Sequence, residues 1–305
     1  MRSRKNKRRT KRILNGLLIL AGLGLVFLAG VLSYKYFIET NQPPEKQVYA
    51  KVDHKLVVIP SLYMTGSSGD TTKNIDRLIK AIDQSDNNPA KPGLKILVDP
   101  TDGYKVNVTG KIEKGNLYPM IALGMTKGTN DPKLYEYSIK AAMDYLVAHY
   151  DMPHVNMLGY STGAAGVLRY LMNYSNDKEL PKVGKFVSLD GMFNDRYAAE
   201  PGESLKDILK NGPKQRSPEY SYWAENSEKF PKDTQTLLLS AKHPGSKESD
   251  NFVPWADSFS TYHFFKKKGG PVSFEVFGGS EYNTNHGKVC ENPQAQGIIE
   301  RFFYS

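Results

Sequence analysis

Short apolar runs alternate with segments of helical periodicity along the chain from residue 48 onward. The runs have the length and the β-branched content of buried strands. They predict strands at residues 57–64, 94–98, 105–109, 117–123, 155–158, 186–189, 236–241 and 272–277. The dipeptide Asp102-Gly103 between the second and third runs predicts a β-hairpin.

The segments between these runs predict helices. Leu134, Tyr137, Ala141 and Tyr145 recur at helical spacing within residues 131–150. Further helices are expected at residues 72–83, from the turn after residue 161 to about residue 174, near residues 255–265 and at residues 293–303. Strands that alternate with helices in this way favour an α/β fold, with a mostly parallel sheet and helices on both faces.

The alternation breaks within residues 191–233, which are rich in charge, Pro, Gly and aromatic side chains. A segment of about forty residues is too long for a plain connection between two elements of a compact domain. We therefore expect a cap or lid insertion. An ordinary surface excursion with small helices of its own is the alternative.

The N-terminus has a different character. Eight of the first 12 residues are Lys or Arg, and residues 13–32 contain no charged side chain. Twenty helical residues span about 30 Å, the thickness of the hydrocarbon core of a bilayer. Because the basic cluster precedes the apolar stretch, the positive-inside rule places the N-terminus in the cytoplasm and the rest of the chain outside.

This pattern predicts four parts: a basic cytoplasmic tail (1–12), an uncleaved single-pass signal anchor that crosses the cell membrane (13–37), a linker (38–47) and an extracellular catalytic domain (48–305). A cleaved signal peptide is the alternative, and it fits less well because its apolar core usually has only about 7–15 residues. A buried core helix would leave the flanking charge unexplained.

The net charge of +9 comes from the tail, since the chain without residues 1–12 has 33 basic and 32 acidic residues. Such a balance provides no basic face, so we expect no nucleic-acid partner. The single cysteine, Cys290, excludes an intrachain disulfide.

One short motif carries chemistry. Gly159-Tyr160-Ser161-Thr162-Gly163 fits G-x-S-x-G, in which the serine occupies a strained conformation at a sharp turn from a strand into a helix. Glycines two positions away avoid collisions with the neighbouring strand and helix. The motif follows a predicted strand and opens a predicted helix, so we predict that Ser161 is a nucleophile. A Gly-rich helix start without a chemical role is the alternative.

A serine nucleophile needs a base, and in this architecture the chain order is serine, carboxylate, histidine. Three of the six histidines precede Ser161 and have the wrong order. His263 lies in a predicted helix among aromatic residues, as a packing residue would, and His243 lies where the acid is expected. His286, in the loop after the last strand, is the predicted base.

The orienting acid is expected in the loop after the strand at residues 236–241. Asp250 is preferred there, with Glu248 and Asp257 as near competitors. Asp190 ends the preceding strand and stays open as an alternative position for the acid.

An oxyanion hole requires two backbone N–H donors. We expect one from Thr162, directly after the nucleophile, and one from the Gly- and Ser-rich loop at residues 65–70. Ser67 is preferred in that loop and Ser68 is second. Chemistry of this kind requires no cofactor and no metal, so none is expected.

Together these residues resemble the α/β-hydrolase superfamily, and more closely a family of exported or membrane-anchored α/β-hydrolases of Gram-positive bacteria. The stretches that carry the resemblance are MTGSSGD, GYSTG, RYLMNYSNDKELPKV, SDNFVP and NHGKVCENP. The resemblance implies an α/β-hydrolase fold with Ser161 as nucleophile, Asp250 as acid and His286 as base. Thr65 stands where that family has a loop histidine, and Tyr160 stands where its serine turn has another, so substrates of relatives do not transfer.

Two functions are consistent with these features. The first is a membrane-anchored extracytoplasmic serine hydrolase that cleaves carboxylic esters of small molecules or lipids through an acyl-enzyme. An amide substrate or an acyl transfer would use the same residues. The second is a non-catalytic surface module that uses the same fold for binding. A complete serine, aspartate and histidine in the expected order argues against the second.

Overall fold

The computed structural model describes residues 21–34, 42–45, 47–50, 52–67, 72–86 and 88–305. It divides into two compact units, Met1–Pro43 and Pro44–Ser305. In the first unit, residues 21–34 form a helix. Among the described residues, no helix is both long enough and apolar enough to cross a membrane. The rest of the predicted anchor at residues 13–37 lies outside the described residues.

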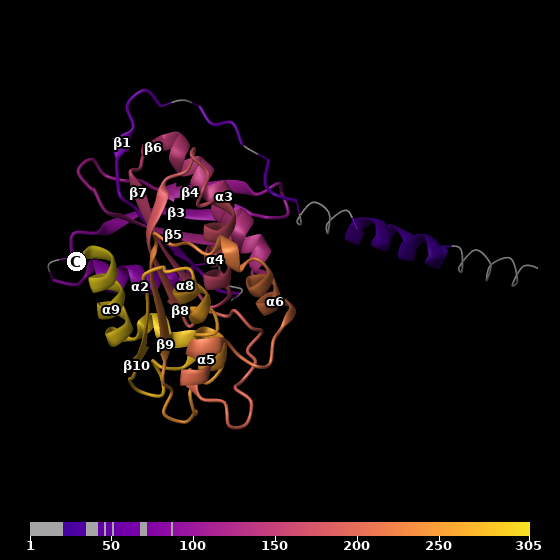
Figure 1. Cartoon of the computed structure of the whole chain (residues 1–305). Helices are drawn as coiled ribbons and strands as arrows, with labels where there is room; N and C mark the ends of the chain where they lie inside the picture. The colour runs from indigo at the N-terminus through magenta and orange to yellow at the C-terminus, as the bar shows by residue number, and fades with distance from the viewer. Residues whose placement is uncertain (1–20, 35–41, 46, 51, 68–71, 87) are drawn as a thin grey trace, which may run out of the picture. The chain divides into compact units, whose positions relative to one another are not determined.

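An eight-stranded sheet forms the centre of the second unit (Figure 1). Its strands are β2 (Ser61–Met64), β3 (Lys91–Asp99), β4 (Lys105–Gly110), β5 (Pro119–Met125), β7 (His154–Tyr160), β8 (Lys182–Leu189), β9 (Gln235–Ala241) and β10 (Val272–Phe277). The order across the sheet is β10-β9-β8-β7-β2-β5-β3-β4. All neighbours are parallel except β3 and β4, which form the expected hairpin. The prediction of a mostly parallel sheet is confirmed.

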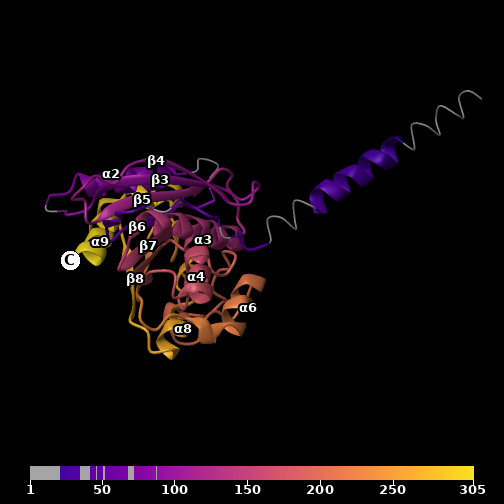
Figure 2. The ribbon, with the colours of Figure 1, turned by 90° about the horizontal axis from the view of Figure 1, so that it is seen from above.

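Helices cover both faces of this sheet (Figure 2). They are α2 (Lys73–Asp83) and α9 (Pro293–Tyr304) on one face, and α3 (Pro132–His149), α4 (Thr162–Tyr174) and α8 (Tyr262–Lys267) on the other. Each face has its own buried cluster: Ile75 and Ile299 belong to the first, Leu146 and Leu168 to the second. Burial of one such side chain contributes about 1.5–3 kcal/mol, so the apolar stripes of the helices fix them on the sheet.

The strand predicted at residues 57–64 is divided into two. β1 (Leu56–Val57) pairs with β6 (Tyr150–Asp151) in a separate two-stranded sheet, and β2 enters the main sheet only at Ser61. Pro60 lies between them and has no N–H to donate, so a continuous ladder is interrupted there.

The helix expected near residues 255–265 is also divided, into α7 (Trp255–Ser258) and α8. Residues 259–261 separate the two pieces.

The segment at residues 191–233 contains two short helices, α5 (Leu205–Asn211) and α6 (Pro218–Glu225), and the 3-10 turn η1 (Ser227–Lys229). The Trp223 indole N–H donates to the Phe193 carbonyl at 2.8 Å, and both side chains are fully buried in the cluster shared with α3 and α4. The segment is therefore packed onto the domain along much of its length.

Candidate active site

Ser161 lies at a sharp turn between β7 and α4, with φ 56° and ψ −131°. Positive φ is strained for a residue with a side chain. The flanking glycines leave the room that this turn needs. A Cβ atom at Gly159 would lie 2.3 Å from the Cα of Ala164, and one at Gly163 would lie 2.2 Å from the Thr65 carbonyl oxygen. The tight packing holds the Ser161 hydroxyl at the carboxyl edge of the sheet.

Three predicted side chains meet at this edge: Ser161, His286 and Asp250. The Ser161 Oγ atom lies 2.9 Å from Nε2 of His286, and Nδ1 of His286 is hydrogen-bonded to Oδ2 of Asp250. His286 begins the 3-10 segment η2 (His286–Glu291) after β10, and Asp250 comes from the loop after β9. Residues that are 36 and 125 positions apart from His286 are thus brought into one chain of hydrogen bonds.

The loop around Asp250 aims its carboxylate. Oδ1 accepts the backbone N–H groups of Phe252 at 2.8 Å and Val253 at 2.6 Å, which leaves Oδ2 for the imidazole. The backbone N–H of His286 also donates to the Asp250 carbonyl at 3.0 Å. A carboxylate at Nδ1 requires the proton on that nitrogen, so Nε2 is the acceptor that faces Ser161.

The imidazole of His286 lies between two aromatic rings. The ring of Tyr160 is stacked on it with centroids 5.3 Å apart, and the ring of Phe252 lies at 5.0 Å. The Tyr160 hydroxyl donates to the His286 carbonyl at 2.6 Å. Tyr160 therefore fixes both the ring and the backbone of the histidine.

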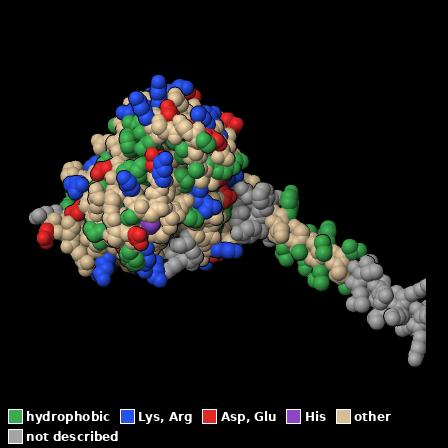
Figure 3. All heavy atoms as spheres, turned by 90° about the horizontal axis from the view of Figure 1, so that it is seen from below, with side chains coloured by type: hydrophobic (Ala, Val, Ile, Leu, Met, Phe, Trp, Pro, Cys, Tyr) green, Lys and Arg blue, Asp and Glu red, His purple; other side chains and the backbone are tan. Residues whose placement is uncertain are grey.

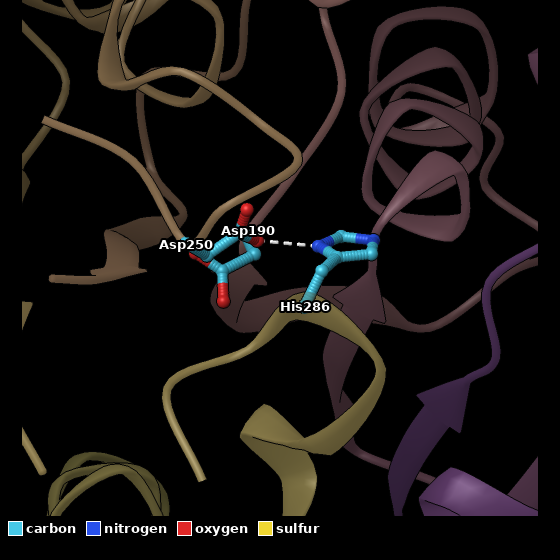
Figure 4. Close-up of side chains that lie close together, drawn as sticks. All are labelled: Asp190, Asp250 and His286. Atoms are coloured by element: carbon cyan, nitrogen blue, oxygen red, sulfur yellow. Dashed lines mark hydrogen bonds and ion pairs between the residues drawn. The ribbon is translucent and has the colours of Figure 1, made fainter. Parts of the chain in front are cut away.

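Asp190, the alternative acid, lies beside this group without a hydrogen bond to His286 (Figure 4). Its Oδ1 accepts the Ser240 hydroxyl at 2.6 Å and the Ala241 N–H at 2.9 Å, and its Oδ2 is buried with no hydrogen-bond partner in the structure. Complete burial, together with the nearby charge of Asp250, raises the pKa of Asp190 well above its usual value. The geometry thus favours Asp250 over Asp190 as the partner of the histidine.

Two of the remaining competitors, Asp257 and His263, are bonded to other groups. Asp257 is fully buried and accepts backbone N–H groups of residues 193, 194 and 196 at 2.5–2.6 Å. Burial raises the pKa of Asp257 to about 7, against the opposing effect of these hydrogen bonds. His263 bonds the Tyr220 hydroxyl at 2.7 Å, and burial lowers the pKa of His263 to about 4. Glu248 precedes Asp250 by two residues at a positive φ of 54°.

Asp190, Asp250 and His286 lie close enough together to be considered as a metal site. One ligand atom from each of Asp190, Asp250 and His286 lies within 4.8 Å of the others. In the observed arrangement, however, Nδ1 of His286 donates to Asp250, and a metal would need that nitrogen deprotonated. Burial also favours the neutral form of Asp190, which is a weak ligand. The donor set therefore fits proton transfer better than metal binding.

The expected oxyanion donors lie close to the serine. Thr162 is the first residue of α4, so its backbone N–H has no acceptor inside the helix. The loop after β2 lies against Ser161, because a Cβ atom at Gly66 would be 2.8 Å from the Cβ of Ser161. Ser67 is the last residue of that loop that the structure describes, and Ser68 lies outside the described residues.

Met192 covers Ser161. Its thioether sulfur lies 3.4 Å from the Ser161 hydroxyl and 3.7 Å from that of Thr162, and Ser161 is only 2% exposed. His286 keeps 13% of its side chain exposed. A cavity of about 820 Å³ lies at the opposite edge of the sheet, near the first residues of β7 and β8, and does not reach Ser161.

Sequence reasoning had not identified Met192, Phe252 and Tyr160 as parts of the site. Tyr160 and Phe252 lie within the motifs GYSTG and SDNFVP, close to the predicted residues Ser161 and Asp250. This closeness in sequence is the feature that could have indicated their part in the site. No feature of the sequence indicates Met192, because it contacts Ser161 from 31 positions away in the chain and lies in irregular backbone.

Comparisons with known proteins agree with this geometry at the level of the fold. A structure of the product of the gene lin2722 from Listeria innocua aligns with a TM-score of 0.69 at 21% identity, covering 80% of this chain and 93% of that one. A Lactobacillus plantarum WCFS1 protein, provisionally named a cell surface hydrolase, aligns with a TM-score of 0.60 at 18% identity, covering 80% and 88%. No curated protein matches the sequence.

A family model described as "Alpha/beta hydrolase of unknown function (DUF915)" matches residues 49–305. The match covers nearly all of the second unit, including the serine turn and the loops of Asp250 and His286. The chain therefore belongs to this α/β-hydrolase family.

Proposed function

We propose that this protein is a serine hydrolase that cleaves carboxylic esters. The observation that carries the proposal is the chain of hydrogen bonds from Ser161 through His286 to Asp250. A non-catalytic binding module would have no need for these three side chains at this geometry. It would also have no need for a serine with strained backbone between two glycines at which any side chain would collide with neighbouring backbone.

In the proposed reaction, Ser161 Oγ attacks the ester carbonyl carbon while Nε2 of His286 takes the hydroxyl proton. Asp250 stabilises the imidazolium that forms. His286 then gives the proton to the departing alkoxide, which leaves as an alcohol, and the acyl group stays on Ser161. Water, deprotonated by His286, attacks the acyl-enzyme and releases a carboxylic acid and free Ser161.

The negative charge on the carbonyl oxygen needs donors that are already in place. We assign this role to the backbone N–H groups of Thr162 and Ser67. The position of Thr162 at the first turn of α4 supports the assignment, because the partial positive charge of a helix N-terminus favours an anion. The close approach of Gly66 to Ser161 supports the assignment of Ser67, the next residue of that loop.

Location is a separate part of the proposal. We propose that residues 13–37 anchor the chain in the cell membrane, with the N-terminus in the cytoplasm and the hydrolase domain outside. The support is the basic segment at residues 1–12 followed by twenty residues without charge. The name of the Lactobacillus plantarum neighbour, which refers to the cell surface, points the same way.

The test is active-site labelling of the full chain with a fluorophosphonate probe, which reacts only with an activated serine. Wild-type protein should be labelled, and Ser161→Ala should not. Ser221→Ala on α6 is the matched control and should label like wild type, since the Ser221 hydroxyl donates to the Ser217 carbonyl at 3.0 Å and lies outside the group of Ser161, His286 and Asp250. Labelling that persists in Ser161→Ala would show that a residue other than Ser161 reacts, and no labelling of folded wild-type protein would favour the binding module.

A further inference from the structure

Arg196 places a positive charge over the ring of Phe252, which lies beside His286. Its guanidinium carbon lies 4.4 Å from the centre of the Phe252 ring, and that ring lies 5.0 Å from the imidazole of His286. The distance from the guanidinium to the imidazole therefore cannot exceed the sum of these two. Within the described part of the chain, this guanidinium lies over the face of Phe252 and forms no ion pair.

The backbone that presents Arg196 is strained and held by a buried carboxylate. Asp195 and Arg196 both have positive φ, 50° and 62°, which is uncommon for two consecutive residues with side chains. The Arg196 N–H donates to Oδ2 of Asp257 at 2.5 Å, and the Asn194 N–H donates to Oδ1 at 2.6 Å. Such strain persists only where the surroundings impose it, so the position of Arg196 is determined by the fold.

Phe252 is fixed as well, although 48% of its side chain is exposed. Its backbone N–H donates to Asp250, the same carboxylate that orients His286. This exposure leaves part of the Phe252 ring open to contact with a bound molecule. In the view from below, Lys and Arg side chains are scattered among hydrophobic and acidic ones (Figure 3).

From this geometry we infer that Arg196 and Phe252 form a subsite for an anionic group of the substrate, a phosphate or a carboxylate a few atoms from the scissile ester. A guanidinium stacked on an aromatic ring keeps its in-plane N–H donors free, and these match two oxygens of such a group. The ring would contact the apolar part of the substrate between the anion and the ester. The inference rests on the proposed function and names the substrate class of that same site.

The test compares esters that differ only in charge. One pair is 1-butyrylglycerol with and without a 3-phosphate, and the other is the 4-nitrophenyl ester of adipic acid with a free or a methylated second carboxyl. Wild-type protein should prefer the anionic member of at least one pair by about tenfold in kcat/KM, as expected for a charge-assisted hydrogen bond. The pair that shows the preference identifies phosphate or carboxylate as the anion.

Arg196→Gln should reduce the preference ratio to about one, and Arg196→Lys should keep part of it because the charge remains. Arg216→Gln is the matched control: Arg216 lies in the same segment and also covers an aromatic ring, that of Tyr220, at 5.5 Å. It should keep both the ratio and the activity. Thermal unfolding of each variant separates a loss of recognition from a loss of folding, since misfolding lowers kcat/KM for both members alike.

Two outcomes would overturn the inference. One is equal rates on both members of both pairs in wild-type protein, and the other is a preference that survives in Arg196→Gln. If neither pair is hydrolysed although the probe labels Ser161, the readout becomes protection from labelling. Glycerol 3-phosphate should then slow labelling of wild type more than glycerol does, and equal protection contradicts the subsite. If the probe does not label Ser161 at all, the proposed function fails and the subsite fails with it.

Discussion

Two neighbouring loops at the carboxyl edge of the sheet each contain a fully buried aspartate, and only one of them reaches the histidine. Asp190 follows β8, and Asp250 lies in the loop after β9, the next strand of the sheet. Both side chains have no exposed surface. Asp250 accepts from His286, whereas Asp190 accepts from Ser240 and Ala241 on β9.

The difference lies in the hydrogen bonds that each loop supplies. Two backbone N–H groups donate to one oxygen of Asp250 and leave the other oxygen for the imidazole. Asp190 has donors on one oxygen only, and the other is buried without a partner. Complete burial and, after it, the nearby charge of Asp250 raise the pKa of Asp190, and a neutral carboxyl is a poor partner for an imidazolium. Position at a strand end thus brings a carboxyl group to the site, and the local donors decide whether one of its oxygens is oriented toward the histidine.

Asp250→Asn should have the largest effect on activity. The amide cannot fix the tautomer in which Nε2 of His286 accepts the serine proton, and it cannot stabilise the imidazolium. We expect ester hydrolysis to fall by about 10³–10⁴-fold in kcat, with the fold retained. Steady-state kinetics with 4-nitrophenyl butyrate measures it. Nearly full activity in this variant would show that the histidine has a different acid.

Tyr160→Phe should have a smaller effect. The variant keeps the ring against His286 and loses the hydroxyl that donates to the His286 carbonyl. One hydrogen bond of this kind is worth about 1 kcal/mol net, which corresponds to about a fivefold lower rate of fluorophosphonate labelling. Tyr170→Phe is the control, because the buried Tyr170 hydroxyl has no hydrogen-bond partner in the structure. Equal labelling rates in the two variants would contradict a positioning role for Tyr160.

Asp190→Asn should change how stability depends on pH. Because the pKa of Asp190 is raised in the folded state, the folded chain keeps a proton that the unfolded chain releases above about pH 3.9. This group therefore lowers the free energy of unfolding as the pH rises from there toward its folded-state pKa. Asparagine carries no such proton, and its backbone tolerates the positive φ of this position. The variant should have a higher Tm than wild type at pH 7, and the gap should close near pH 4.

The same substitution should have the smallest effect on catalysis. Asparagine at position 190 still accepts from Ser240 and Ala241 through its amide oxygen, and no hydrogen bond joins the site to His286. We expect kcat/KM within about twofold of wild type, which is the size of a minor change in packing around the site. A loss as large as that of Asp250→Asn would reverse the assignment of the two carboxylates.

Much of this architecture could be predicted from the order of apolar runs. The alternation of strands and helices led to the mostly parallel sheet, and Asp102-Gly103 to the hairpin of β3 and β4. The prediction of one strand at residues 57–64 was wrong, because the apolar pattern continues through Pro60 although Pro60 has no N–H to donate. The structure has two separate strands there, β1 and β2. The interior of residues 191–233 could not be predicted, because its two short helices depend on packing against the rest of the domain.

The sequence by itself determined the serine turn and the candidates around it. Only Gly159 and Gly163 permit the close approach of strand, loop and helix at Ser161, and this constraint is local and therefore visible in a motif. The choice among the carboxylates, the aromatic rings around His286 and the position of Arg196 were decided by the tertiary structure. Each depends on hydrogen bonds or ring contacts between loops that lie 34 to 126 residues apart in the chain. Such contacts form only when the sheet brings the ends of its strands to one edge.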